Sequence, residues 1–135
     1  MKIDSHHHFW KYDPHTYSWM NEKMEVLKVD YQPVDLKKEI EEAGIDGVVS
    51  VQADQSLRET DDLLEHAKTN DFILGVVGWF PLADTNVEHL FDKYSNNQLL
   101  KGIRHVIQDE PDDNFILGDQ FNRGVSLIKD YNWVY

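Results

Sequence analysis

Three histidines near the start of the chain have the spacing of a catalytic or metal-binding motif. The first ten residues read Met-Lys-Ile-Asp-Ser-His-His-His-Phe-Trp and contain the pattern Asp4-x-His6-x-His8. Alternate residues of a strand point to the same side, so His6 and His8 are expected on one face and His7 on the other. Two imidazoles placed in this way can converge on one metal ion or on one polarised oxygen.

Two alternatives to a chemical role stay open for the histidine run. The first is a purification tag, but tags are usually longer, and here Phe9 and Trp10 follow directly without a linker. The second is that the histidines are simply packed or solvated side chains. Two ligands alone do not make a zinc site, which takes three or four.

The elements that must position these histidines alternate between apolar runs and amphipathic stretches. The apolar runs predict strands over 2–6, 46–53, 72–80 and 99–106, and a further strand beginning within 132–135. Helices are predicted over 35–43, 56–69, 86–95 and 119–131. The aromatic segment 9–20 has no regular period, which indicates a loop that packs its own aromatics or covers a substrate.

The spacing of the strand ends favours a barrel. The predicted strands end near His6, Gln52, Trp79 and His105, and the last two intervals are about 26–27 residues, the size of one βα unit. An open parallel sheet would normally carry a glycine-rich phosphate loop after its first strand, and this chain does not. We therefore predict the α/β class and a (β/α)8 barrel, of which residues 1–135 form a single domain with four βα units and the start of a fifth strand.

Composition narrows the classes of function. The 135 residues are 41% hydrophobic and include no cysteine, which excludes disulfides and thiolate ligands and is typical of a reducing cytoplasm. The formal net charge of −12 argues against nucleic-acid binding. No signal peptide or apolar run of membrane-spanning length is present in the sequence, so a cytoplasmic protein without membrane contact is expected.

Five segments of the chain resemble the amidohydrolase-related (amidohydrolase 2) family, and within it the branch of the L-fuconolactonases and L-rhamnonolactonases. These segments are Ile3-Asp4-Ser5-His6-His7-His8-Phe9-Trp10, Tyr17-Ser18-Trp19-Met20, Val51-Gln52-Ala53, Val77-Gly78-Trp79 and Lys101-Gly102-Ile103-Arg104-His105-Val106-Ile107-Gln108-Asp109-Glu110-Pro111. The resemblance implies a (β/α)8 barrel of which this chain is the N-terminal half. It also implies a hydrolase that opens a small cyclic ester, a sugar-derived lactone, by attack of water on the ring carbonyl.

Four residues are expected to carry the chemistry that this resemblance implies. His6 and His8 would bind a divalent metal, zinc before others, or would hydrogen-bond the lactone carbonyl in a metal-free site. Arg104 would stabilise the developing oxyanion and His105 would assist as a donor. These two residues are adjacent, so both reach one site only if the strand end splays into a loop. The alternative for Arg104 is a surface ion pair with Asp109 or Glu110.

Three further residues are expected to contact the substrate. Gln52 would orient a sugar hydroxyl, and Trp10 and Trp79 would form apolar walls against a sugar ring. The alternatives are a capped strand end for Gln52 and plain packing for the two tryptophans. The resemblance assigns a further histidine and a water-activating aspartate to later strands of the barrel, so residues 1–135 alone are expected to have little or no activity.

Two further functions remain open. One is a metal-dependent decarboxylase or amide hydrolase of the same superfamily, and the other is a non-catalytic half-barrel. The apolar inner face and the unpaired strand edges of such a half would be covered by the other half or by a second copy, so a homo-oligomer is also an open expectation.

Overall fold

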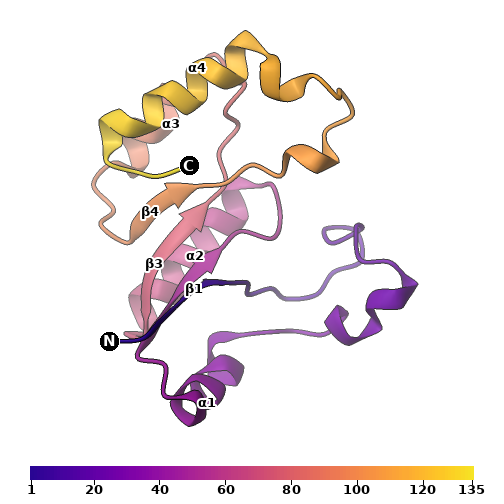
Figure 1. Cartoon of the computed structure of the whole chain (residues 1–135), viewed down its shortest axis with the longest axis vertical. Helices are drawn as coiled ribbons and strands as arrows, with labels where there is room; N and C mark the ends of the chain where they lie inside the picture. Colours follow the sequence, from indigo (N-terminus) through magenta and orange to yellow (C-terminus); the bar gives the residue numbers. More distant parts are fainter.

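Four parallel strands form the sheet of the structure, a computed structural model that describes residues 1–135 (Figure 1). The strands are β1 (Ile3–His7), β2 (Gly47–Val51), β3 (Ile73–Gly78) and β4 (Leu100–Ile103), and they lie side by side in the order β1-β2-β3-β4. Each neighbouring pair is parallel. The four predicted strands are therefore present, and β2, β3 and β4 end two or three residues earlier than predicted because the chain there turns into loops.

A helix follows each of the four strands, as the alternation in the sequence predicts. These helices are α1 (Pro33–Ala43), α2 (Leu57–Thr69), α3 (Val87–Tyr94) and α4 (Asp119–Ile128). Short 3-10 helices lie in the connections: η1 (Glu22–Leu27), η2 (Ile107–Asp109), η3 (Phe115–Leu117) and η4 (Lys129–Tyr131). No helix has both the length and the apolar character needed to cross a membrane.

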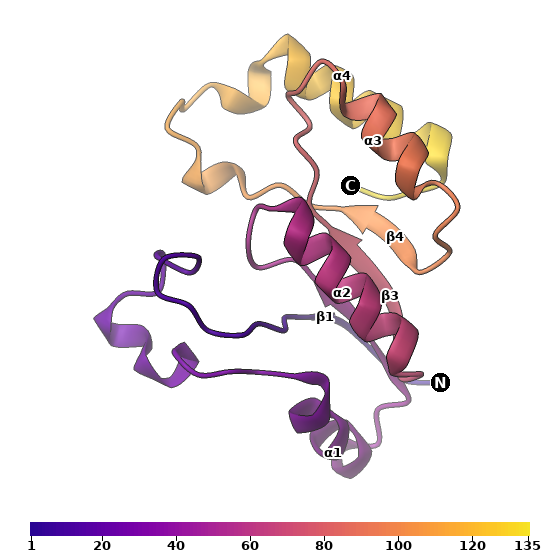
Figure 2. The ribbon, with the colours of Figure 1, turned by 180° about the vertical axis from the view of Figure 1, so that it is seen from behind.

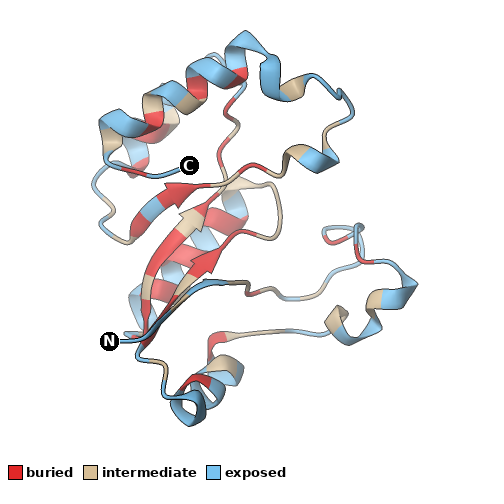
Figure 3. Ribbon diagram, viewed as in Figure 1, coloured by how far each residue is buried: buried red, intermediate tan, exposed pale blue.

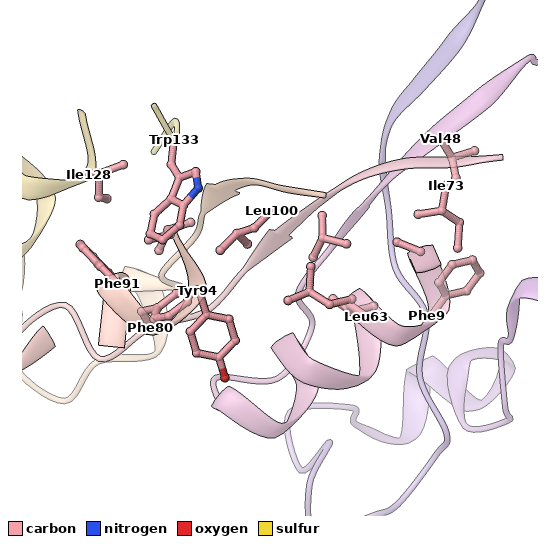
Figure 4. Close-up of a cluster of buried hydrophobic side chains, with 14 of the residues drawn as sticks. Phe9, Val48, Leu63, Ile73, Phe80, Phe91, Tyr94, Leu100, Ile128 and Trp133 are labelled. Carbon is pink, nitrogen blue, oxygen red and sulfur yellow. The ribbon is translucent and has the colours of Figure 1, made fainter. Parts of the chain in front are cut away.

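The hydrophobic core lies between the sheet and its helices (Figures 2 and 4). At one end Leu63 of α2 packs with Val48 and Ile73 of the strands. At the other end Phe80 and Trp133 are stacked with their ring centroids 5.9 Å apart. β1 is largely exposed, whereas β2 and β3 are mostly buried (Figure 3), so the first strand is the open edge of the sheet.

The opposite edge of the sheet holds the start of a fifth strand position. Val134 donates its N–H to Lys101 O (3.0 Å) and accepts the N–H of Ile103 at its own carbonyl (2.8 Å). The partner opposite Val134 is Gly102, where a Cβ atom would lie 2.8 Å from Val134 O. A glycine is therefore needed for this close approach. The strand predicted within 132–135 is present as this single parallel bridge, which continues the βα succession of a barrel.

Candidate active site

Four side chains that could take part in catalysis or binding follow the four strands at the same edge of the sheet. His8, Gln52, Trp79 and Arg104 are each the residue immediately after the end of β1, β2, β3 and β4. Carboxyl ends of parallel strands meet at one edge, which is where barrel enzymes place their chemistry. The order of strands and loops therefore places these four residues in one region. Their side-chain contacts show which of them line a cavity.

His6 and His8 lie side by side, as strand alternation predicts. Their Nε2 atoms are 3.3 Å apart, and their rings meet edge to face with centroids 4.9 Å apart. His6 is exposed and His8 is half-buried. The two nitrogen atoms thus point toward one common position at the mouth of the sheet.

The tautomer of His8 follows from its hydrogen bond to the backbone. His8 Nδ1 lies 2.9 Å from Val51 O, which can only accept, so Nδ1 carries the proton and Nε2 presents its lone pair. Burial lowers the pKa of His8, so the ring is neutral at pH 7. His8 Nε2 therefore presents its lone pair toward His6 Nε2, where it can accept a hydrogen bond or bind a metal ion.

The spacing of the two imidazoles fits a shared metal ion. Two nitrogen ligands at 2.0–2.1 Å in tetrahedral geometry are about 3.3 Å apart, which is the separation of the two Nε2 atoms. The backbone carbonyl that orients His8 is a common outer partner of metal-bound histidine. No third histidine or carboxylate of the chain completes the set, so residues 1–135 provide two ligands at most.

His7 points to the opposite face and is part of the packing between strands. Its Nε2 lies 3.0 Å from Ser50 Oγ of β2, and its ring meets Phe9 edge to face. Burial lowers the pKa of His7 to about 4, against the partly opposing effect of Asp4. His7 is therefore a neutral, structural histidine next to two chemically available ones.

We expect acid to destabilise the protein through His7. The pKa is lower in the folded state than in the unfolded chain, so the unfolded state binds the proton first and stability falls as the pH drops from about 6.5 toward 4. Between pH 7 and pH 5 the loss should be about 1 kcal/mol, because part of the ring reaches solvent. Urea unfolding at both pH values should show a smaller pH dependence for His7→Gln than for the wild type.

The control for this measurement is His15→Gln, which replaces an exposed loop histidine. It should leave the pH dependence of unfolding as in the wild type. An equal pH dependence in the wild type and His7→Gln would contradict the assignment of His7 as a buried neutral group.

Arg104 contributes the positive charge of the site. Its Nη1 donates to the backbone oxygen of Gln52 at 3.1 Å, which fixes the guanidinium across the ends of β2 and β4. Arg104 forms no ion pair in the structure, and Glu110 instead contacts His105. The alternative of an ion pair with the acidic loop is therefore wrong, and the remaining N–H groups of Arg104 are available to a ligand.

His8 and Arg104 share one cavity of about 350 Å³. Its remaining lining residues are Trp19, Ala53, Val106 and Asp109. Trp19 is 43% exposed on the segment before η1, and Asp109 ends η2. The sequence predicts Trp19 in an aromatic loop, and no local signal in it identifies Trp19 or Asp109 as a wall of this cavity.

The structure corrects the expectation that both Arg104 and His105 reach the site. His105 is 9% exposed and is held between two partners, since Trp79 Nε1 donates to its Nδ1 (3.2 Å) and its Nε2 donates to Glu110 Oε1 (2.5 Å). Its ring also stacks on Phe115 with centroids 5.0 Å apart. His105 and Trp79 therefore secure the loop after β4, and neither lines the cavity of His8.

Gln52 and Trp10 also lie outside that cavity. Gln52 is fully buried, and its Nε2 donates to Arg104 O, so it supports Arg104 and does not face a ligand. Trp10 donates from Nε1 to the carbonyls of Leu27 and Val29. Trp10 and Tyr31 also exchange two backbone hydrogen bonds of 2.9 and 3.0 Å. Trp10 thus closes the base of the loop 11–30, which carries Trp19 to the cavity.

Comparison with known proteins gives consistent results for sequence and structure. The model of a family described as amidohydrolase matches residues 3–135. An L-fucono-1,5-lactonase of Burkholderia multivorans is 35% identical over 136 residues, which cover 100% of this chain and 46% of that protein. An L-fucono-1,5-lactonase of Burkholderia ambifaria is 30% identical over 115 residues, or 85% of this chain and 40% of that protein. The chain thus spans about half the length of the curated relatives it matches.

Solved structures agree with the barrel assignment. An amidohydrolase from Burkholderia multivorans with bound zinc superposes with a TM-score of 0.94 at 34% identity, covering 100% of this chain and 48% of that one. Amidohydrolase 2 from Bifidobacterium longum subsp. infantis superposes with a TM-score of 0.67 at 22% identity, covering 98% of this chain and 49% of that one. The second likeness concerns the fold alone.

Proposed function

Because the chain belongs to the amidohydrolase family, we propose that residues 1–135 provide one half of a site that hydrolyses a sugar-derived lactone. The observation that carries the proposal is the arrangement of the paired Nε2 atoms of His6 and His8 beside the guanidinium of Arg104 at one edge of the sheet. The similarity to proteins named L-fucono-1,5-lactonase supports a cyclic ester as the substrate.

The reaction places distinct demands on these residues. Water adds to the ring carbonyl carbon, the bond from that carbon to the ring oxygen breaks, and the ring oxygen takes a proton, which yields a hydroxy acid. The carbonyl oxygen becomes negative on the way, and Arg104 is placed to hold that charge with the N–H groups not bonded to Gln52 O. His8 Nε2 presents its lone pair toward His6 Nε2, so the pair of imidazoles is placed to hold a metal ion beside Arg104.

The same two imidazoles would hold a divalent metal, and their spacing fits zinc. When bound, such an ion supplies Lewis acidity to the site. His8 cannot donate from Nε2 while Nδ1 is bonded to Val51 O. In a metal-free site His6 would therefore be the histidine that donates to the carbonyl oxygen.

The walls of the cavity suit a small polar ring. Trp19 offers an aromatic face of the kind that packs against a sugar, and Asp109 offers a carboxylate that accepts from sugar hydroxyls. The remaining barrel strands would supply the missing ligands and the group that activates water. The substrate is thus proposed as a neutral hydroxylated lactone.

The test is a panel of aldonolactones assayed with a pH indicator. Two samples are compared: residues 1–135 alone, and a completed barrel in which residues 1–135 continue into the second half of the Burkholderia multivorans lactonase. We expect the completed barrel to hydrolyse at least one lactone, and the 135 residues alone to be slower by about 10²–10⁴, the effect of losing a general base.

Circular dichroism of both samples controls for folding. If the completed barrel is folded but hydrolyses none of the lactones above background, the proposal is refuted. Equal rates for the two samples would show that residues 1–135 contain the whole site, and would refute the assignment of half the chemistry to later strands.

A further inference from the structure

A buried carboxylate on α2 lies behind the wall of the candidate site. Glu59 is 6% exposed, and its Oε2 accepts two backbone N–H groups of the turn between β2 and α2, from Ala53 (2.9 Å) and Asp54 (2.5 Å). Its other oxygen, Oε1, is buried without a hydrogen-bond partner. A helix cap does not account for this arrangement, because Ser56 already caps α2 through the N–H of Glu59.

The turn that Glu59 holds is connected to the cavity on both sides. Ala53 lines the cavity directly, and Gln52, one residue earlier, gives its carbonyl to Arg104. Gln55, one residue after Asp54, accepts the N–H of Val106 at 2.8 Å, and Val106 is another lining residue. The turn therefore bridges the ends of β2 and β4.

We propose that Glu59 is a positioning residue of the candidate site, which holds the turn 53–55 so that Gln55 fixes Val106 and the Gln52 carbonyl fixes Arg104. The expected effect of Glu59 on catalysis rests on the proposed function. The structural content of the proposal, a carboxylate linked through one turn to the end of β4, can be measured without any substrate.

The electrostatic surroundings of Glu59 make the link sensitive to pH. The titratable and charged groups around it, on the loop 11–30, the turn and α2, are Lys11, Tyr12, Asp13, Tyr17, Asp54, Arg58, Asp62, Glu65 and His66. Burial raises the pKa of Glu59 to about 7, the two backbone N–H groups oppose the rise, and the carboxylates of Asp54 and Asp62 add to it. The ionised form accepts more strongly from Ala53 and Asp54, so it should hold the turn more firmly.

Nitrogen-15 NMR of the protein between pH 5 and 9 tests the link directly. We expect the amide signals of Ala53 and Asp54 to titrate together with a midpoint near 7, and the amide of Val106 to follow them. In Glu59→Gln the amide oxygen can still accept both N–H groups, but it cannot ionise, so the three signals should stop titrating. The control Glu65→Gln, an exposed residue of α2 paired with Lys68, should titrate like the wild type.

Gln55→Ala separates the two halves of the link. It should leave Ala53 and Asp54 titrating and should abolish the response of Val106. A Val106 signal that is the same in the wild type, Glu59→Ala and Gln55→Ala would refute the proposal, and so would a Val106 signal that titrates equally with and without the Gln55 side chain.

Activity of the completed barrel provides the second readout. Glu59→Ala and Gln55→Ala should each lower kcat/KM by about 10- to 100-fold through misplacement of the site. Glu59→Gln should keep most of the activity at pH 8 but lose the rise in rate through pH 7. If no lactone is hydrolysed while the amide signals behave as expected, the proposed function fails and the positioning of the turn by Glu59 is still supported. A full wild-type rate and pH profile in both alanine variants would refute the positioning role.

Discussion

Replacing His8 with alanine should lower kcat/KM of the completed barrel by about 10²–10³, the effect of losing one group that supports the charge on the carbonyl oxygen, here by holding the metal ion. His8 presents an unprotonated Nε2 fixed by its bond to Val51 O, 3.3 Å from His6 Nε2. The variant removes that lone pair and the partner of His6 together. The measurement is lactone hydrolysis beside zinc binding by isothermal titration calorimetry.

The variants of the two histidines should be strongly non-additive. If His6 and His8 hold one ion or one oxygen, the double variant should be little worse than either single variant. His15→Ala, in an exposed loop, is the matched control and should be neutral. Activity that survives a chelator would exclude the metal-dependent decarboxylase and amide hydrolase alternatives, whereas unchanged kcat/KM in His8→Ala would contradict the site itself.

Arg104→Met should cost about 10²–10³ in kcat, with a smaller change in KM. The reason is that the charge of the carbonyl oxygen develops in the transition state, where a fixed cation has its greatest effect. Arg104→Lys should recover part of the loss, since it restores the charge without the planar donor fork that bonds Gln52 O. Steady-state kinetics of both variants on the best lactone provide the measurement.

Arg123→Met is the control for this substitution. Arg123 is a second arginine, on α4, partly exposed and paired with Glu88 of α3. Its removal should leave kcat and KM unchanged. An Arg104→Met variant that raises KM alone would assign Arg104 to ground-state binding, and the oxyanion role would then be wrong.

Strand periodicity was enough to predict the placement of the histidines. A period of two puts His6 and His8 on one face and His7 on the other, and the structure shows this separation down to the contact of His7 with Ser50. The same rule says that only one of Arg104 and His105 faces the cavity, and that is what the structure shows. The expectation that the strand end would splay to admit both was wrong, because Trp79 and Glu110 hold His105 on the other side.

The walls of the cavity could not be predicted in this way. Gln52 and Trp79 lie at strand ends, as predicted. Their side chains, however, form hydrogen bonds to residues distant in sequence and do not line the cavity. Trp19 and Asp109 line the cavity because of the paths of two loops, which depend on tertiary contacts and not on local pattern. The positions of the strand ends can thus be predicted from the sequence, whereas the side chains that line the cavity next to them cannot.

The closed base of the loop 11–30 has a consequence for how proteins built on this scaffold can diversify. Trp10 and Tyr31 join the two ends of the loop through backbone hydrogen bonds, and Trp10 Nε1 secures them further. Residues between these anchors can be lengthened, shortened or exchanged for those of another member without disturbing the sheet, because their ends are already held together. We expect a change of selectivity to be transferable as one exchanged loop, with His6 and His8 left untouched beside it.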